Sequence, residues 1–167
     1  MRWLVEPLPE EASGQRQQHD AAYGLLCRLV DGTPVLEHDD KGAPYLPEYP
    51  QLHVSISHCR AAVAVAVSSD GPVGIDIECR RKIGPSLAER VCTAAEQADI
   101  AASDDPEMAF LRLWTRKEAV LKCRGTGIKG FGSMVEALND ERMAVTDLPC
   151  DLPDVVVSLA QVVATDV

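Results

Sequence analysis

The stretch from His53 to Glu78 reads HVSISHCRAAVAVAVSSDGPVGIDIE, and its spacing predicts three β-strands. Polar and apolar residues alternate over 53–57, small apolar residues fill 62–67, and alternation resumes over 73–78 after a turn rich in Ser, Asp, Gly and Pro. Connections this short join neighbouring antiparallel strands. The stretch therefore predicts an antiparallel strand meander.

Helical spacing on both sides of the meander predicts three helices, over residues 13–29, 86–102 and 106–123. Ser13 is the candidate N-cap of the first helix, and a loop with Gly125 and Gly127 ends the third. The proline-rich residues 31–50 have the composition of a surface loop.

Two further strands are expected over 143–145 and 155–164. Helices interleaved with short, mostly antiparallel strands predict an α+β fold in which the helices pack on the meander. With 167 residues, 46% of them hydrophobic and 25% charged, the chain fits one compact domain over 1–167, or two small halves that share a core.

The formal net charge of −10, from 16 Lys and Arg against 26 Asp and Glu, argues against nucleic acid and anionic membranes as partners, because like charges repel. The longest run of small apolar residues, 61–67, is far shorter than the roughly 20 residues that cross a bilayer. Near the N-terminus, Glu6 and Pro7 interrupt the apolar segment that a secretory signal needs. We therefore expect a cytoplasmic protein.

The six cysteines are spread along the chain, with no C-x-x-C pair. Three disulfides are one arrangement, but a chain of this length does not need such cross-links, and we expect free, mostly buried thiols. His58 and Cys59 are adjacent on a predicted strand, so their side chains point to opposite faces and form a poor catalytic pair or zinc site.

Asp76 and Glu78 lie two residues apart on a predicted strand, so their carboxylates project from the same face, about 7 Å apart at the backbone. Such a pair suits a divalent cation with oxygen ligands, because Mg²⁺ takes one or two carboxylates together with waters and substrate phosphates. Taken alone, such a pair is weak evidence for a metal site and is far more typical of a solvated sheet face.

The predicted helix over 106–123 places Trp114, Glu118 and Lys122 on one stripe. An acid and a base four residues apart usually form an exposed ion pair. Here the large aromatic residue makes the stripe at least half buried, and buried charges need a partner such as a metal or a phosphate.

Ser57 and His58 end the first strand of the meander, and a hydroxyl and an imidazole are natural contacts for a phosphate. The pairing of the meander would bring them close to Asp76 and Glu78. Taken alone, His58 is also typical of a structural or surface histidine.

Together these segments resemble the 4′-phosphopantetheinyl transferase superfamily. Its pattern is a serine-histidine at a strand end, then G-x-D-x-E, then W-x-x-K-E-A-x-x-K on a helix. The sequence supplies SH at 57–58, GIDIE at 74–78 and WTRKEAVLK at 114–122. The match extends over about residues 42–130, in the family's order.

The resemblance implies a 4′-phosphopantetheinyl transferase-like fold with pseudo-twofold lobes, similar to a shortened member of the two-lobed surfactin-synthetase-activating type. An abbreviated N-terminal lobe would span about 1–70 and a C-terminal lobe about 71–167. The implied reaction moves the 4′-phosphopantetheine arm from coenzyme A to a serine of an acyl or peptidyl carrier protein. It depends on Mg²⁺, with Mn²⁺ as a substitute, and releases adenosine 3′,5′-bisphosphate.

The resemblance also assigns roles to individual residues. Asp76, Glu78 and Glu118 match the ligands of the cation. Lys122 matches a residue that contacts the phosphate, and His58 one that contacts the 3′-phosphate of the nucleotide. Asp76, Glu118 and Lys122 are thus the expected catalytic set, in which Glu118 is a ligand, the base that deprotonates the serine, or both.

Two further nucleotide contacts are expected, and one of them departs from the family. Ser57 adjoins His58. Lys41 is a displaced substitute, because the family's Gly-Lys-Pro is Gly42-Ala43-Pro44 in this chain. The basic candidates in the shortened first lobe are Arg2, Arg16 and Arg28.

The charge is unevenly distributed along the chain. Residues 79–130 carry ten Lys and Arg against seven Asp and Glu, a net of 10 − 7 = +3. An anionic nucleotide and an acidic carrier protein would be steered to this segment. Two other hypotheses remain: a non-catalytic module that binds coenzyme A or a carrier protein, and an unrelated α+β domain whose acidic residues are merely solvated.

Overall fold

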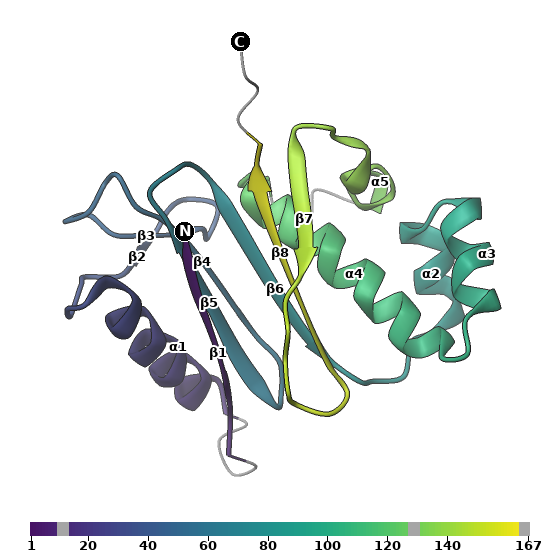
Figure 1. Cartoon of the computed structure of the whole chain (residues 1–167), viewed down its shortest axis with the longest axis horizontal. Helices are drawn as coiled ribbons and strands as arrows, with labels where there is room; N and C mark the ends of the chain where they lie inside the picture. The colour runs from purple at the N-terminus through teal and green to yellow at the C-terminus, as the bar shows by residue number, and fades with distance from the viewer. Residues whose placement is uncertain (10–13, 127–130, 164–167) are drawn as a thin grey trace.

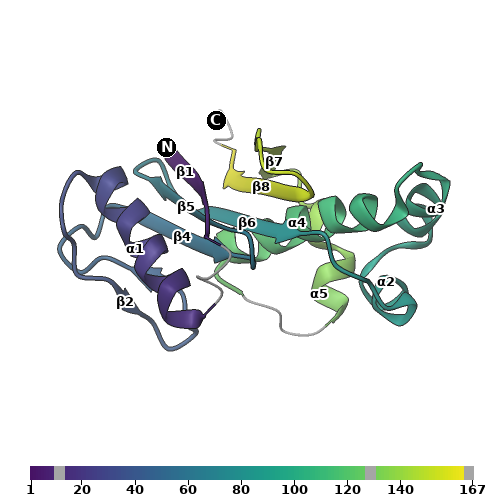
Figure 2. The ribbon, with the colours of Figure 1, turned by 90° about the horizontal axis from the view of Figure 1, so that it is seen from below.

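Antiparallel strands form three separate sheets in the computed structural model, which describes residues 1–9, 14–126 and 131–163 (Figure 1). Helices pack against the two larger sheets, so the predicted α+β class is confirmed. Figure 2 shows α1 at one end of the molecule and α2 and α3 at the other.

The first sheet comes from the N-terminal part of the chain and has the strand order β1-β5-β4. The elements of this part are β1 (Arg2–Pro7), α1 (Gln15–Val30), β2 (Glu37–His38), β3 (Pro44–Tyr45), β4 (His53–His58) and β5 (Ala62–Ser68). The short strands β2 and β3 pair with each other. Helix α1 packs on β5, where Val63, Val65 and Val67 face its leucines.

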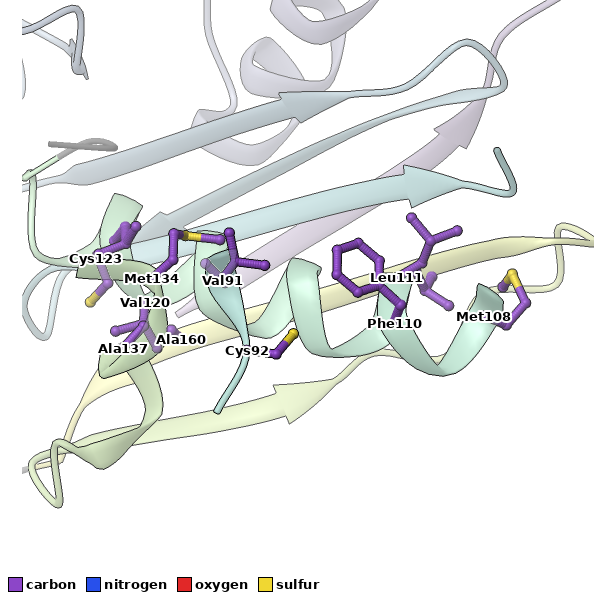
Figure 3. Close-up of a cluster of buried hydrophobic side chains, with 13 residues drawn as sticks. Val91, Cys92, Met108, Phe110, Leu111, Val120, Cys123, Met134, Ala137 and Ala160 are labelled. Atoms are coloured by element: carbon purple, nitrogen blue, oxygen red, sulfur yellow. The ribbon is translucent and has the colours of Figure 1, made fainter. Parts of the chain in front are cut away.

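The second large sheet has the order β6-β8-β7. The elements are β6 (Val73–Cys79), α2 (Pro85–Val91), α3 (Ala94–Ala102), α4 (Pro106–Cys123), α5 (Phe131–Val135), the 3-10 helix η1 (Ala137–Asn139), β7 (Met143–Asp147) and β8 (Val155–Val162). Helix α4 packs across β6 and β8. Residues from α4, α5 and β8 share the buried cluster drawn in Figure 3, which includes Leu111, Val120, Met134 and Ala160.

The predicted meander is correct for β4 and β5 but wrong for β6. Strand β5 lies in the centre of its sheet, because β1 occupies the edge that the meander leaves for β6. Sequence analysis did not predict β1, and β6 pairs with β8 instead. Strands β4 and β6 nevertheless lie side by side and run in the same direction. Hydrogen bonds from the backbone N–H groups of Ile75 and Ile77 to the hydroxyls of Ser55 and Ser57 show this arrangement.

The predicted helix over 86–102 is two helices. Cys92 is extended, and Thr93 begins α3 with a capping box in which Thr93 and Glu96 each accept a hydrogen bond from the other's backbone N–H. Helix α4 agrees with the prediction for 106–123. Ser13 lies outside the described residues, and α1 begins at Gln15 after Gly14.

The region 31–50 is largely exposed, as predicted, but it contains the β2–β3 pair and a fully buried Leu46. All six cysteines are free and four are buried, which confirms the expectation of unpaired thiols. Within the described residues, no helix combines the length and apolar character needed to cross a membrane.

Candidate active site

Gly74 allows helix α4 to lie directly against strand β6. A Cβ atom on Gly74 would lie 1.9 Å from the Ala119 carbonyl oxygen and 2.5 Å from the Cys123 nitrogen, well inside van der Waals contact. Asp76 and Glu78 follow at intervals of two residues, so they share the face that Gly74 presents to the helix. The glycine of G-x-D-x-E therefore brings the two acids under α4.

Asp76 lies at the centre of the site and is almost fully buried, with 6% of its surface exposed. Its Oδ1 accepts hydrogen bonds from Ser57 Oγ and Lys122 Nζ, each at 2.8 Å. Its Oδ2 is buried and has no hydrogen-bond partner among the described residues. An unpaired buried carboxylate oxygen is costly, so this atom marks a position where a ligand fits.

Glu118 faces the two acids of β6 from α4. Burial raises its pKa to about 7, Asp76 and Glu78 add to the increase, and Lys122 opposes it. Negative charge is thus concentrated here without enough positive charge to balance it. Glu78 has a cationic neighbour of its own, because Arg81 donates to both of its carboxylate oxygens, at 3.3 and 3.4 Å.

The three acids predicted to bind Mg²⁺ share one region, but they do not form a closed ligand set. Across the part of the chain that the structure describes, no group of three His, Cys, Asp or Glu side chains gathers closely enough to hold a metal. The residues still fit a divalent cation, because Asp76 Oδ2 has no partner among the described residues and Glu118 is a buried carboxyl group close to Asp76 and Glu78. Glu78 could join them by leaving Arg81.

Lys122 and Ser57, both expected to contact the nucleotide, each donate a hydrogen bond to Asp76. Besides Asp76, the Lys122 ammonium donates to the carbonyl oxygens of Ile75 at 3.2 Å and Ile56 at 3.5 Å. Ser57 is buried, with 8% of its surface exposed. Both side chains therefore hold the acid in place in the structure.

A cavity of about 180 Å³ opens beside Lys122. Lys41 and Ala43 line it, together with Ser55 and Ile56 of β4. Lys41, which sequence analysis expected to contact the nucleotide, thus lines a cavity together with Lys122. Ala43, at the position of the family's lysine, offers this cavity a methyl group only.

A second cavity, of about 190 Å³, adjoins the first, since Gly42 and Ile56 line both. His58 lines it with His19 of α1 and His38 of β2, and the ring centroids of His19 and His58 are 6.4 Å apart. Burial lowers the pKa of His58, and His19 and Lys122 lower it further.

Sequence analysis missed His19 and His38. His19 lies three residues before Ala22, which faces the core on α1, so helical spacing was a signal that the histidine lies near that face. No comparable signal pointed to His38, whose position depends on the path of the β2–β3 loop.

The positive charge of residues 79–130 is largely neutralised by ion pairs. Of the nine cations that lie in the described part of this segment, at least six contact carboxylates: Arg80, Arg81, Arg116, Lys117, Lys122 and Arg124. Arg80 alone contacts Asp105, Glu107 and Asp154. The segment therefore attracts anions less than its composition suggests.

The two motifs lie where the sequence predicts them: G-x-D-x-E is on strand β6, and W-x-x-K-E-A-x-x-K is on helix α4, which packs against that strand. Residues 72–151 match the family model of the 4′-phosphopantetheinyl transferase superfamily. The match confirms the predicted resemblance to that superfamily.

Individual relatives are similar over a longer stretch. The chain is 36% identical over 118 residues to the 4′-phosphopantetheinyl transferase psf-1 of Bacillus pumilus, covering 69% of this chain and 50% of that protein. It is 37% identical over 106 residues to the 4′-phosphopantetheinyl transferase AcpT of Salmonella typhimurium, covering 60% of this chain and 55% of that protein. The Bacillus subtilis transferase Sfp is 37% identical over 89 residues, 52% of this chain and 39% of Sfp. The chain thus spans about half the length of the curated relatives it matches.

Proposed function

We propose that the protein transfers the 4′-phosphopantetheine arm from coenzyme A to a serine of an acyl or peptidyl carrier protein. The main support is Oδ2 of Asp76, which is buried without a hydrogen-bond partner among the described residues and lies near Glu118, whose pKa burial raises; both acids match the superfamily's motifs. A buried acidic cluster of this kind needs a cation, and a cation is what attack on a pyrophosphate requires.

Asp76, Glu78 and Glu118 would hold Mg²⁺, with Mn²⁺ as a substitute. When bound, the cation neutralises negative charge on the pyrophosphate of coenzyme A. The serine oxygen forms a bond to the phosphorus of the arm, the pyrophosphate P–O bond breaks, and adenosine 3′,5′-bisphosphate leaves with the bonding electrons. Atoms and charges balance if a base in the site takes the serine proton.

Glu118 is the base that fits this step best. A general base works well when its pKa is near the operating pH, and Glu118 has a pKa of about 7. It would accept the proton of the serine hydroxyl directly or through one water. A role in binding the cation is compatible with this, because a carboxylate has two oxygens.

The two adjoining cavities would take the nucleotide. His58, with His19 and His38 beside it, would contact the 3′-phosphate, and Lys41 and Lys122 line the neighbouring cavity. We also infer one domain over 1–167 with lobes over about 1–70 and 71–167. In support, the two large sheets have the same strand arrangement. In each, the strand that comes last in the chain, β5 or β8, lies in the centre between the two that precede it.

One observation favours a second candidate function. Ala43 leaves the first cavity without the lysine of the family pattern, which would suit a module that binds coenzyme A or a carrier protein without transfer. Calorimetry with coenzyme A, in parallel with the transfer assay, separates the two functions: binding without turnover selects the module.

The test is the mass of an apo carrier protein after incubation with the protein, coenzyme A and Mg²⁺. We expect the carrier to gain the mass of the arm, and Asp76→Asn and Glu118→Gln to abolish the gain. Glu89→Gln is the matched control, because it neutralises an exposed carboxylate on α2 and should transfer normally. An unchanged mass for several apo carriers that a control transferase modifies would refute the proposal.

A further inference from the structure

Two buried serines join the two large sheets where β4 and β6 run side by side. Ser55 Oγ accepts a hydrogen bond from the Ile75 backbone N–H at 3.0 Å, and Ser57 Oγ accepts one from the Ile77 N–H at 3.4 Å. Both serines are less than a tenth exposed. Each serine therefore contributes one hydrogen bond to the contact between the strands.

Only Ser57 has a second role. Its hydroxyl hydrogen is donated to Asp76 Oδ1 at 2.8 Å, and Lys122 Nζ donates to the same oxygen at the same distance. The other two acceptors of Lys122 are the carbonyl oxygens of Ile75 and Ile56. An ammonium group has three N–H donors, so Lys122 has one protein acceptor for each.

These contacts leave the two oxygens of Asp76 in opposite states. Oδ1 accepts two hydrogen bonds, one of them from a cation, whereas Oδ2 is buried with no partner among the described residues. A carboxylate held in this way cannot rotate freely, because rotation would break both bonds to Oδ1. One oxygen is fixed in the protein and the other stays available.

We propose that Ser57 and Lys122 are positioning residues that fix Asp76 so that it binds a divalent cation through Oδ2 alone. This inference rests on the cation of the proposed function, but it concerns this chain's own residues. Groups that orient a metal ligand typically change metal affinity by about 10–100-fold when they are removed.

The test compares Ser57→Ala with Ser55→Ala. Each variant removes one hydroxyl from the contact between β4 and β6, but only the first releases Asp76. The affinity for Mg²⁺ alone is measured from the shift in unfolding temperature as Mg²⁺ is added. We expect Ser57→Ala to weaken Mg²⁺ binding about tenfold and Ser55→Ala to change it less than twofold. Equal responses of the two variants would overturn the proposal.

Lys122→Met tests the lysine through Mg²⁺ binding measured without coenzyme A. A positioning role predicts Mg²⁺ binding about tenfold weaker than that of the parent. Mg²⁺ binding within about twofold of the parent would overturn this part of the proposal, whatever the effect on KM for coenzyme A. Should Ser57→Ala lose its native circular dichroism, Ser57→Thr retains the hydroxyl and is expected to bind Mg²⁺ within twofold of the parent; a tenfold loss there would count against the proposal.

The outcome for this inference is separable from that for the transferase. The Mg²⁺ measurement uses neither coenzyme A nor a carrier protein. Mg²⁺ binding that depends on Ser57 in a protein without transfer would refute the transferase and support the positioning role. If both serine variants bind Mg²⁺ equally well and the protein still transfers the arm, the transferase is supported and the positioning role of Ser57 is refuted.

Discussion

Helix α4 carries two lysines, Lys117 and Lys122, whose side chains contact different parts of the molecule. Lys117 is completely buried and donates to the Val91 carbonyl at 2.8 Å, to Glu96 at 2.7 Å and to the Val135 carbonyl at 3.5 Å. Lys122 also has three acceptors, but its side chain is 29% exposed. Each ammonium is saturated, yet the surroundings of the two differ.

The difference lies in what surrounds each cation. Glu96 pairs with Lys117 and also caps α3 through the Thr93 N–H, so its charge is balanced. Around Lys122, Asp76 retains an unpartnered oxygen and Glu118 has a raised pKa. The comparison teaches that the first cluster is complete and stabilises the fold, whereas the second lacks positive charge and fits a ligand.

Lys117→Met should have the largest effect on stability. Removing one partner of a buried ion pair costs about 3–5 kcal/mol, because the remaining charge and the two carbonyls lose their donor. Urea denaturation would measure the free energy of unfolding. The double variant with Glu96→Gln should recover part of the loss, and a loss below about 1 kcal/mol would contradict the view of a structural Lys117 cluster.

Gly74→Ala should rank next, because the added methyl group meets the backbone of α4. We expect a loss of about 2–3 kcal/mol, since overpacking against backbone cannot relax by side-chain rotation. Gly24→Ala is the control: Gly24 lies in α1 with no atom near its missing Cβ, so alanine should stabilise by about 0.5–1 kcal/mol. Equal stability of the two variants would mean that α4 does not need close contact with β6.

The pH dependence of stability tests the shortage of positive charge near Lys122. Glu118 has a pKa of about 7 in the folded protein and 4.5 as an unperturbed group. The folded state therefore binds more protons between these values, and this contribution to stability is lost as the pH rises from about 4.5 to 7.

Mg²⁺ should reverse that loss. It should raise the unfolding temperature by a few degrees at pH 8 and very little at pH 5, where Glu118 is protonated. Glu118→Gln should flatten the profile between pH 4.5 and 7 and reduce the response to Mg²⁺ at pH 8. Calorimetric melts at both pH values, with and without Mg²⁺, measure this, and an equal Mg²⁺ response at both would show that Glu118 is not involved.

Thr93→Ala should have the smallest effect. It removes the side-chain cap of α3 while Glu96 keeps its contact with Lys117, so we expect a loss of about 1 kcal/mol. Chemical denaturation would again provide the free energy. A loss close to that of Lys117→Met would mean that the cap, rather than the ion pair, holds this cluster together.

Local features were the ones that the sequence could predict. Asp105 and Pro106 signal the start of α4, and the helix begins there. The capping box of Thr93 and Glu96 was also readable, although the prediction ran one helix through it. Alternation in β6 placed Asp76 and Glu78 on one face correctly.

Features that depend on contacts distant in the sequence were not predictable. The place of β6 follows from β1 occupying the free edge of β5, and nothing within the meander reveals this. The bond of Ser57 to Asp76 depends on β4 lying beside β6, and the bond of Lys122 to Asp76 depends on α4 packing across β6. For the same reason, His19 and His58 come together only once α1 packs on the first sheet.

The contact between β4 and β6 also affects how the protein can open. Within the described residues, no backbone-to-backbone hydrogen bond joins these strands, whereas β6 and β8 are paired along their whole length. The amides of Ile75 and Ile77 donate to serine hydroxyls, so their hydrogen exchange should report local separation of the two sheets. Since Asp76 lies between these two amides, separation of the two sheets at this boundary would open the acidic cluster.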